Sequence, residues 1–282
     1  MEEIANNVYI ESEFPGVVLA AIKFREVIIM IDAPFRREDQ RMWQTCLSDL
    51  GDSTKRFLVN LDTHVDRTWG VSAMEAVVVS HANALDILEG RPASCRIQDI
   101  EPGAECEAYD LPSNNRWVVP DMSYTQSLLM HWDDRSVILT HHPGVHAAAT
   151  WVQYDTEKTL FVGDSVMLNQ PPFLQFANLP IWVQELEALL SDTFKGYKIV
   201  SGRNGVVRKR SIEKWKNFLL KLKDTVDQVA EGNGEVVNMI EQVPNLLEKL
   251  SFNRDFSELY TSRLIWGLEA YYRRHYSELK PS

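Results

Sequence analysis

The stretch Phe57–Gly70 constrains the fold of this chain more than any other part of the sequence. It begins with an apolar run over residues 57–59, which is typical of a short buried strand. Polar residues follow directly, with Asp62, His64 and Asp66 at every second position. Such residues point the same way if the backbone stays extended. The pattern therefore predicts two carboxylates and an imidazole at the carboxyl end of a strand, where ligands bind in α/β folds. The alternative is a polar loop that contains a helix cap.

Composition limits the kind of partner that the chain can bind. The 282 residues, 45% hydrophobic and 24% charged, are enough for one large domain or for a domain with an extension. Lys and Arg number 29 and Asp and Glu number 40, so the formal net charge is −11. This charge repels phosphate backbones and argues against nucleic acid or an anionic membrane as the main partner.

Cysteine usage and the N-terminus favour a cytoplasmic protein. Cys46, Cys95 and Cys106 have no metal-binding spacing, so we interpret them as reduced thiols and leave one pairing as the alternative. The first residues are acidic and lack an apolar segment, which predicts that there is no signal peptide. No apolar run is long enough to span a bilayer.

The first half of the chain predicts a sheet with crossover helices. Periodicity indicates strands over residues 8–10, 17–24, 27–31, 57–61 and 76–80, and helices over Arg36–Leu50 and Ala82–Glu89. A strand–helix–strand order implies neighbouring parallel strands. Asp32 and His81 each follow a strand at this edge. We interpret Asp32 as a structural turn residue, and we favour a helix cap or a packing residue over a pocket residue for His81.

The second half predicts a second set of strands followed by helices. Residues 92–120 are irregular and are interpreted as a surface excursion, either a lid or a dimer contact. Strands are indicated around 128–130, 136–140, 150–154, 159–162 and 197–200, with a helix over 183–190. Amphipathic helices follow over 211–231, 236–250 and 256–276. We favour an annex packed on the main domain over a partner-binding module for these helices.

This order of elements resembles the metallo-β-lactamase superfamily. The superfamily signature is a strand followed by Thr-His-x-His-x-Asp-His-x-Gly-Gly. Asp62 and His64 stand at its first two His positions, Asp66 at its Asp and Arg67 at its last His. The run over residues 159–166, TLFVGDSV, resembles the segment that carries the bridging aspartate, here Asp164.

Two further histidines of the superfamily are replaced. Val145 stands in the Pro-Gly-His turn, and Arg203 stands in the Gly-His-Gly turn. His142 and His146 flank Val145, so a shifted loop would bring one of them to the site. The resemblance covers residues 6–207 without a break in the order of elements.

The resemblance implies an α/β fold and an altered metal centre. Residues 1–207 are expected to form a four-layer αββα sandwich, and residues 208–282 a C-terminal helical extension packed on it. A full superfamily site holds two ions, commonly zinc, which activate water. Here the resemblance implies one ion at most, or none, held by Asp62, His64 and Asp164 with Asp66. Zinc, manganese or iron would suit, and Asp66 is also the candidate general base.

The roles of the remaining candidates stay open. Arg67 and Arg203 either bind an anionic substrate or replace the charge of the second ion, because guanidinium cannot ligate a metal but pairs with carboxylates. The alternative is a plain salt-bridge cluster that holds an inert scaffold. His142, His146 and His81 complete the candidate pocket residues.

Two functions follow from these expectations. One is a metal-dependent hydrolase with a reduced metal site that acts on a small anionic substrate. The other is an inactive relative that binds a small anionic ligand or a protein partner. No nucleotide-binding glycine loop or nucleophile elbow is present in the sequence. We expect no nucleic-acid or membrane partner, and a homodimer is left open.

Overall fold

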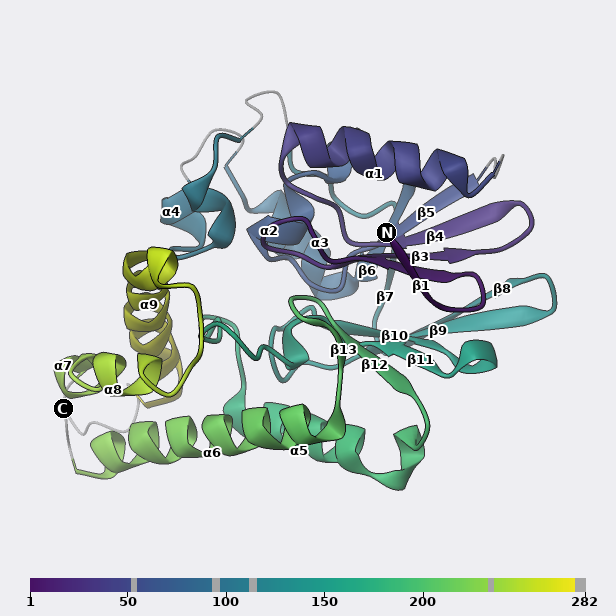
Figure 1. Cartoon of the computed structure of the whole chain (residues 1–282). Helices are drawn as coiled ribbons and strands as arrows, with labels where there is room; N and C mark the ends of the chain where they lie inside the picture. Colours follow the sequence, from purple (N-terminus) through teal and green to yellow (C-terminus); the bar gives the residue numbers. More distant parts are fainter. Residues whose placement is uncertain (52–54, 93–96, 112–115, 233–235, 277–282) are drawn as a thin grey trace.

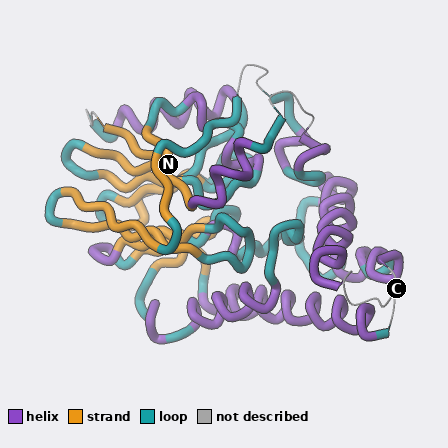
Figure 2. The backbone as a smooth tube through the Cα atoms, turned by 180° about the vertical axis from the view of Figure 1, so that it is seen from behind, coloured by secondary structure: helices purple, strands orange, loops and turns teal. Residues whose placement is uncertain are grey.

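Two β-sheets stacked face to face form the centre of the protein, with helices on both outer faces (Figure 1). The computed structural model describes residues 1–51, 55–92, 97–111, 116–232 and 236–276. The view from behind shows the strands gathered between the two helical layers (Figure 2). This is the αββα sandwich expected from the sequence.

The first sheet has seven strands in the order of the sequence. They are β1 (Glu2–Ala5), β2 (Val8–Glu11), β3 (Leu19–Lys23), β4 (Val27–Ile31), β5 (Lys55–Val59), β6 (Val77–His81) and β7 (Met122–Tyr124). β1 to β4 pair antiparallel, and β4 to β7 pair parallel. The parallel half brings the carboxyl ends of β4, β5 and β6 to one edge, where the polar residues of the signature stretch follow.

The second sheet has six strands in the order β13-β12-β11-β10-β9-β8. They are β8 (Ser127–Trp132), β9 (Arg135–His141), β10 (Thr150–Tyr154), β11 (Thr159–Phe161), β12 (Lys198–Ser201) and β13 (Gly205–Val207). Only β11 and β12 pair parallel among the described strands of this sheet. Their carboxyl ends lead into the segments of Asp164 and Arg203, so both residues leave this sheet at the same edge.

Nine α-helices are seen in the described part of the chain. They are α1 (Arg37–Asp49), α2 (Val65–Thr68), α3 (Ala82–Glu89), α4 (Ile97–Ile100), α5 (Leu179–Leu190), α6 (Lys209–Glu231), α7 (Val236–Ile240), α8 (Val243–Leu247) and α9 (Ser257–Tyr276). α1 covers the first sheet, α5 and α6 cover the second, and α7 to α9 lie at one end of the sandwich (Figure 1). No described helix is both long and apolar enough to cross a membrane.

Three apolar layers hold the sandwich together. Between the sheets, Ile29, Leu139 and Val152 are fully buried. Trp43 of α1 packs on the outer face of the first sheet, and Trp182 of α5 packs on the second. Burying one aliphatic side chain, such as that of Ile29, stabilises the fold by about 1.5–3 kcal/mol. The apolar face of α6 belongs to the same cluster as α5, and the domain boundary at residue 207 stays a prediction.

Three sequence-based expectations differ from the structure. The single helix expected over residues 236–250 is divided into α7 and α8, because Pro244 in the first turn of α8 has no N–H to continue a helix. The strands β1 and β13 were not anticipated. The described part of the excursion expected over residues 92–120 is not simply a surface segment, because Glu101, Glu105 and Cys106 are buried. Residues 93–96 and 112–115 of that range lie outside the described residues.

The cysteine prediction is tested in part. Cys46 and Cys106 are free thiols. Cys95 lies outside the described residues.

Candidate functional site

The polar residues after β5 begin a short helix instead of continuing the strand. His64 is the N-cap of α2, and Asp66 and Arg67 lie within that helix. The expectation that Asp62, His64 and Asp66 alternate along an extended backbone is therefore wrong. Asp62 Oδ1 accepts a hydrogen bond from the His64 N–H at 2.8 Å, which is an Asx-type turn and favours the start of a helix. All four side chains are nevertheless buried.

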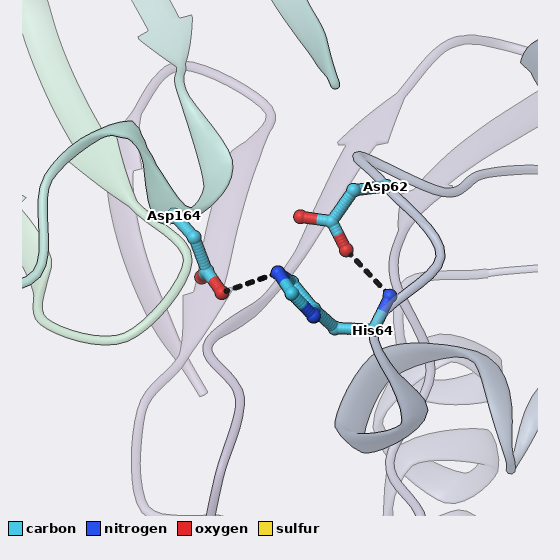
Figure 3. Close-up of side chains that lie close together, drawn as sticks. All are labelled: Asp62, His64 and Asp164. Atoms are coloured by element: carbon cyan, nitrogen blue, oxygen red, sulfur yellow. Dashed lines mark hydrogen bonds and ion pairs between the residues drawn. The ribbon is translucent and has the colours of Figure 1, made fainter. Parts of the chain in front are cut away.

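Asp62, His64 and Asp164 come together as one group (Figure 3). One ligand atom from each lies within 4.8 Å of the others. His64 Nε2 is 3.8 Å from Asp164 Oδ2. Asp62 Oδ2 and His64 Nε2 are both buried and have no hydrogen-bond partner in the described structure. Two buried, unpartnered ligand atoms that converge with a second carboxylate fit a bound cation.

Glu101 orients His64 from the middle of the irregular segment. Its Oε1 contacts His64 Nδ1, and its Oε2 accepts the Val65 N–H at 2.9 Å. A carboxylate on Nδ1 leaves Nε2 free for a metal ion. Burial acts to lower the pKa of His64, but Glu101, Asp62 and Asp164 outweigh it and raise that pKa. Burial likewise acts to raise the pKa of Glu101, but His64 lowers it to about 2.

Arg67 occupies one of the places where the superfamily has a histidine of the second metal site. Its side chain is fully buried among three carboxylates. NH1 donates to Asp32 Oδ2 at 2.7 Å, Nε lies 3.0 Å from Asp62 Oδ1, and NH2 donates to Asp164 Oδ1. Asp32 is thus a member of the cluster, and its interpretation as a turn residue only was incomplete. Its backbone φ is 60°, and its carboxylate also accepts the Leu61 N–H at 3.0 Å.

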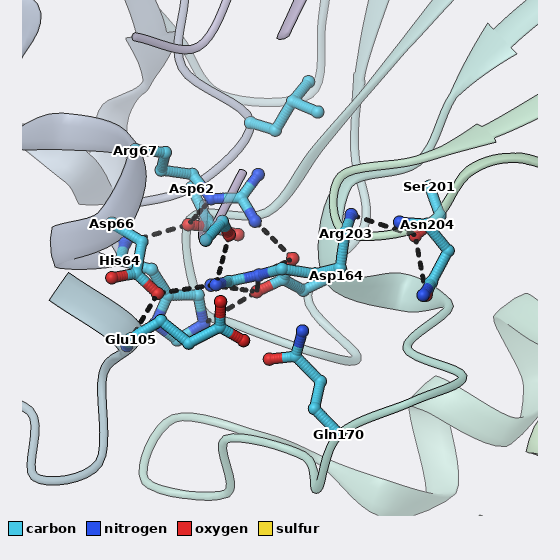
Figure 4. Close-up of polar contacts among 12 residues, drawn as sticks. Asp62, His64, Asp66, Arg67, Glu105, Asp164, Gln170, Ser201, Arg203 and Asn204 are labelled. Carbon is cyan, nitrogen blue, oxygen red and sulfur yellow. Dashed lines mark hydrogen bonds and ion pairs between the residues drawn. The ribbon is translucent and has the colours of Figure 1, made fainter. Parts of the chain in front are cut away.

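Arg203 occupies the other histidine place (Figure 4). Its NH1 donates to Asp66 Oδ2 and to the Gly16 carbonyl, both at 2.5 Å. Nε donates to Asp164 Oδ1 and NH2 to Asp164 Oδ2, each at 3.0 Å. Burial acts to raise the pKa of Asp164, but Arg203 and Arg67 hold it well below its usual range. Both guanidinium groups are therefore engaged by carboxylates, which favours charge replacement over substrate binding.

Asp66 is enclosed by donors. Its Oδ1 accepts the Cys106 N–H at 2.9 Å, and its Oδ2 accepts the Glu105 N–H at 3.3 Å in addition to Arg203. These contacts favour a role in holding Arg203. The role of Asp66 as general base or metal ligand stays a prediction.

Of the histidines near Val145, His146 lies near the site but does not offer it a ligand atom. Its ring centroid is 5.1 Å from that of His64. The Ala148 N–H donates to Nδ1 at 3.0 Å, so Nε2 carries the proton and faces Thr63 Oγ1 at 3.1 Å. Val145 is buried in the apolar cluster that also contains Trp182 of α5.

His142 and His81 have packing and capping roles in the structure. His142 stacks on Trp151 with a centroid distance of 3.6 Å, and burial lowers its pKa to about 4. His81 caps α3 by accepting the Asn83 N–H, and its Nε2 faces the Thr125 carbonyl at 2.7 Å. The helix-cap interpretation of His81 is confirmed.

No sequence-family model matches the chain, and no curated protein matches it in sequence. Its structure is similar to solved structures. A stereoselective inverting sec-alkylsulfatase from Pseudomonas sp. is 14% identical, with a TM-score of 0.67 over 99% of this chain and 52% of the other. A metallo-β-lactamase family protein from Thermus thermophilus is 12% identical, with a TM-score of 0.66 over 95% and 93%. A metallo-β-lactamase from Pontibacter korlensis is 15% identical, with a TM-score of 0.59 over 78% and 97%.

These likenesses establish the fold. The chain has the metallo-β-lactamase fold, which confirms the resemblance drawn from the signature stretch and the order of elements. It spans about half the length of the alkylsulfatase chains. Asp62, His64 and Asp164, three of the residues that the resemblance implies as metal ligands, form a candidate metal-binding group in the described structure.

Proposed function

We propose that the protein is a metallo-β-lactamase-fold hydrolase that works with one divalent cation at most and acts on a small anionic substrate. Asp62, His64 and Asp164 would hold the cation. The observation that carries this proposal is the pair of buried, unpartnered atoms Asp62 Oδ2 and His64 Nε2. An unsatisfied buried polar atom is costly, so two that converge indicate a ligand.

The charges of the cluster support one cation and argue against two. The four carboxylates that contact the two arginines, Asp32, Asp62, Asp66 and Asp164, contribute −4. Arg67 with Arg203 contribute +2, which leaves −2, the charge that one divalent cation balances. The second superfamily site lacks both of its histidines, and its remaining oxygens are bound by guanidinium. A single imidazole among carboxylates suits manganese or iron at least as well as zinc.

The residues of the site would position the reacting groups. A divalent ion supplies Lewis-acid activation of water when bound. Glu101 fixes the ring of His64, and the two arginines fix Asp62 and Asp164 so that no rearrangement is needed on binding. Asp66 remains the proposed base.

A second candidate is a non-catalytic relative that binds a small anionic ligand or a protein partner. The observation in its favour is that Arg67 and Arg203 neutralise the carboxylates without any metal. Buried ion-pair networks of this kind also serve purely structural roles.

A hydrolase screen with and without Mn²⁺, Zn²⁺ or Fe²⁺ separates the two candidates. Esters, lactones, thioesters and phosphodiesters with an anionic group are the substrates to try. We expect cation-dependent hydrolysis that Asp62→Asn reduces by about 10- to 100-fold. Asp49→Asn, an exposed carboxylate on α1, is the matched control and should leave the rate unchanged. Silence across all substrates and cations, with folding intact, contradicts the hydrolase and supports the second candidate.

A further inference from the structure

We propose that Arg263 on α9 binds the anionic group of the ligand, so that the C-terminal helices form part of the site. This inference rests on the proposed function, because it assumes that a ligand binds at the group of Asp62, His64 and Asp164. Its test measures binding and needs no turnover.

Arg263 is a buried cation that forms no salt bridge among the described residues. Burial lowers the pKa of its guanidinium, and the nearby carboxylates of Glu105 and Asp66 oppose this without contacting it directly. The exposed fraction of Arg263 is 1%. Nε donates to the Gly103 carbonyl at 2.8 Å, and NH1 donates to Gln170 Oε1 at 2.7 Å and to the Pro171 carbonyl at 3.1 Å. All three acceptors are neutral. An unpaired buried charge is costly, which indicates that an anion completes its contacts.

One nitrogen of this guanidinium is unused. NH2 of Arg263 is buried and has no hydrogen-bond partner in the described part of the chain. Arg67 and Arg203 differ in this respect, because both of their NH groups donate to carboxylates. Arg263 is therefore better suited than either of them to bind an incoming oxyanion.

The ring of Phe173 places Arg263 beside the cluster. The Cζ atom of Arg263 is 3.9 Å from the ring centroid, and Cζ of Arg203 is 5.3 Å from it. The centroid of the His64 ring is 4.3 Å from the same centroid. One aromatic ring thus contacts the candidate metal ligand and both arginines. Gln170, which accepts from Arg263 NH1, is drawn together with Asp164 and Arg203 in Figure 4.

The surrounding contacts fix the guanidinium in place. The ring centroid of Tyr260 lies 4.6 Å from Cζ of Arg263, and the Tyr260 hydroxyl donates to Glu105 Oε1 at 2.6 Å. Gly103 packs directly on α9, because a Cβ atom there would lie 2.4 Å from Cβ of Arg263. The segment that carries Glu101 and Glu105 is thereby attached to α9. Such preorganisation lowers the cost of ordering Arg263 when a ligand binds.

The chemistry of the free nitrogen defines the ligand class. A guanidinium NH₂ group donates charge-assisted hydrogen bonds to a small oxyanion, such as a carboxylate or a phosphate group. The cation site would then hold one end of an anionic substrate and Arg263 the other. The annex would select substrates by this group, while the residues of the sandwich hold the reacting end.

Calorimetric titration with acetate and with inorganic phosphate at constant ionic strength tests the proposal. The wild-type protein should bind at least one of these anions, and Arg263→Gln should bind it at least about tenfold more weakly. Arg263→Lys keeps the positive charge but lacks the planar guanidinium, so its affinity for the anion should lie between those of the wild type and Arg263→Gln. Arg274→Gln is the matched control, because Arg274 lies on the same helix and donates to the Gln175 and Ala177 carbonyls. It should bind like the wild type.

Two results overturn the proposal. One is the absence of anion binding by the wild-type protein, and the other is equal affinity in Arg263→Gln. If that variant does not fold, a crystal structure of the wild-type protein with phosphate decides: the anion must lie within hydrogen-bond distance of Arg263 NH2, and an anion elsewhere refutes the assignment. Anion binding without any hydrolysis contradicts the proposed hydrolase but leaves this inference standing.

Discussion

Replacing Arg67 by methionine tests whether a guanidinium neutralises the buried carboxylates. The substitution keeps a long apolar side chain and removes the charge that contacts Asp32, Asp62 and Asp164. Asp164 retains Arg203, but Asp32 loses its only cation among the described residues. Breaking a buried ion pair from one side costs about 3–5 kcal/mol of folding free energy.

The loss should grow with pH, because Asp32 is a carboxyl whose folded pKa is raised. Burial raises the pKa to about 6, even though Arg67 acts to lower it. A carboxyl with a raised pKa binds more protons in the folded state, so stability falls as pH rises from its unfolded pKa to its folded pKa. In the wild type this decline ends near pH 6. Without Arg67 the pKa rises further and the decline continues, by up to about 1.4 kcal/mol per pH unit.

Urea denaturation followed by circular dichroism at pH 6, 7 and 8 measures this effect. We expect the difference in unfolding free energy between wild type and Arg67→Met to be about 3 kcal/mol at pH 6 and to increase by about 1–3 kcal/mol by pH 8. Arg41→Met, an exposed arginine on α1, is the control and should change stability by less than about 0.5 kcal/mol. A small loss that is independent of pH would refute the role assigned to Arg67.

Other residues give separate tests. Burial raises the pKa of the Glu185 carboxyl to about 8, so Glu185→Gln should stabilise the protein by about 1–3 kcal/mol at pH 8 and hardly at pH 4.5; equal effects at both pH values in urea titrations contradict this. Glu101→Gln should lower the pKa of His64, which an NMR titration of the imidazole measures; an unchanged pKa contradicts the pairing. Gly144→Ala should lower the free energy of unfolding by about 1–3 kcal/mol, because the added Cβ atom would lie 2.5 Å from Trp182 Cα. An unchanged melting temperature would contradict this expectation.

The fold could be predicted from the sequence because its evidence is local and ordered. Apolar runs that end in polar residues indicated β5 and β6. The order of all the expected elements along the chain matched that of the metallo-β-lactamase superfamily. The same order of elements predicted that Arg67, Asp164 and Arg203 lie together. The short helix α2 was missed because four residues carry too little periodicity to be recognised.

The rest of the site could not be predicted, because it depends on contacts between distant segments. Glu101 lies 37 residues from His64 in an irregular segment, and no spacing links the two. Arg263 lies on α9, and the apolar pattern of that helix indicates only that it packs on the sandwich. Nothing in the sequence indicated that this arginine would be buried. Asp32 resembled an ordinary turn residue after a strand. Each of these required the packed structure, because burial without a counter-charge is a property of the tertiary fold.

The metal content of the purified protein tests the central claim most directly. Elemental analysis of protein purified without chelator should find at most one divalent transition metal per chain, weakly bound, because Arg67 and Arg203 occupy the oxygens of the second site. The Arg67→His, Arg203→His double variant should bind additional metal, since imidazole supplies the missing nitrogen ligands. Two equivalents of tightly bound zinc in the wild-type protein would contradict the account, because the described residues offer no second set of ligands.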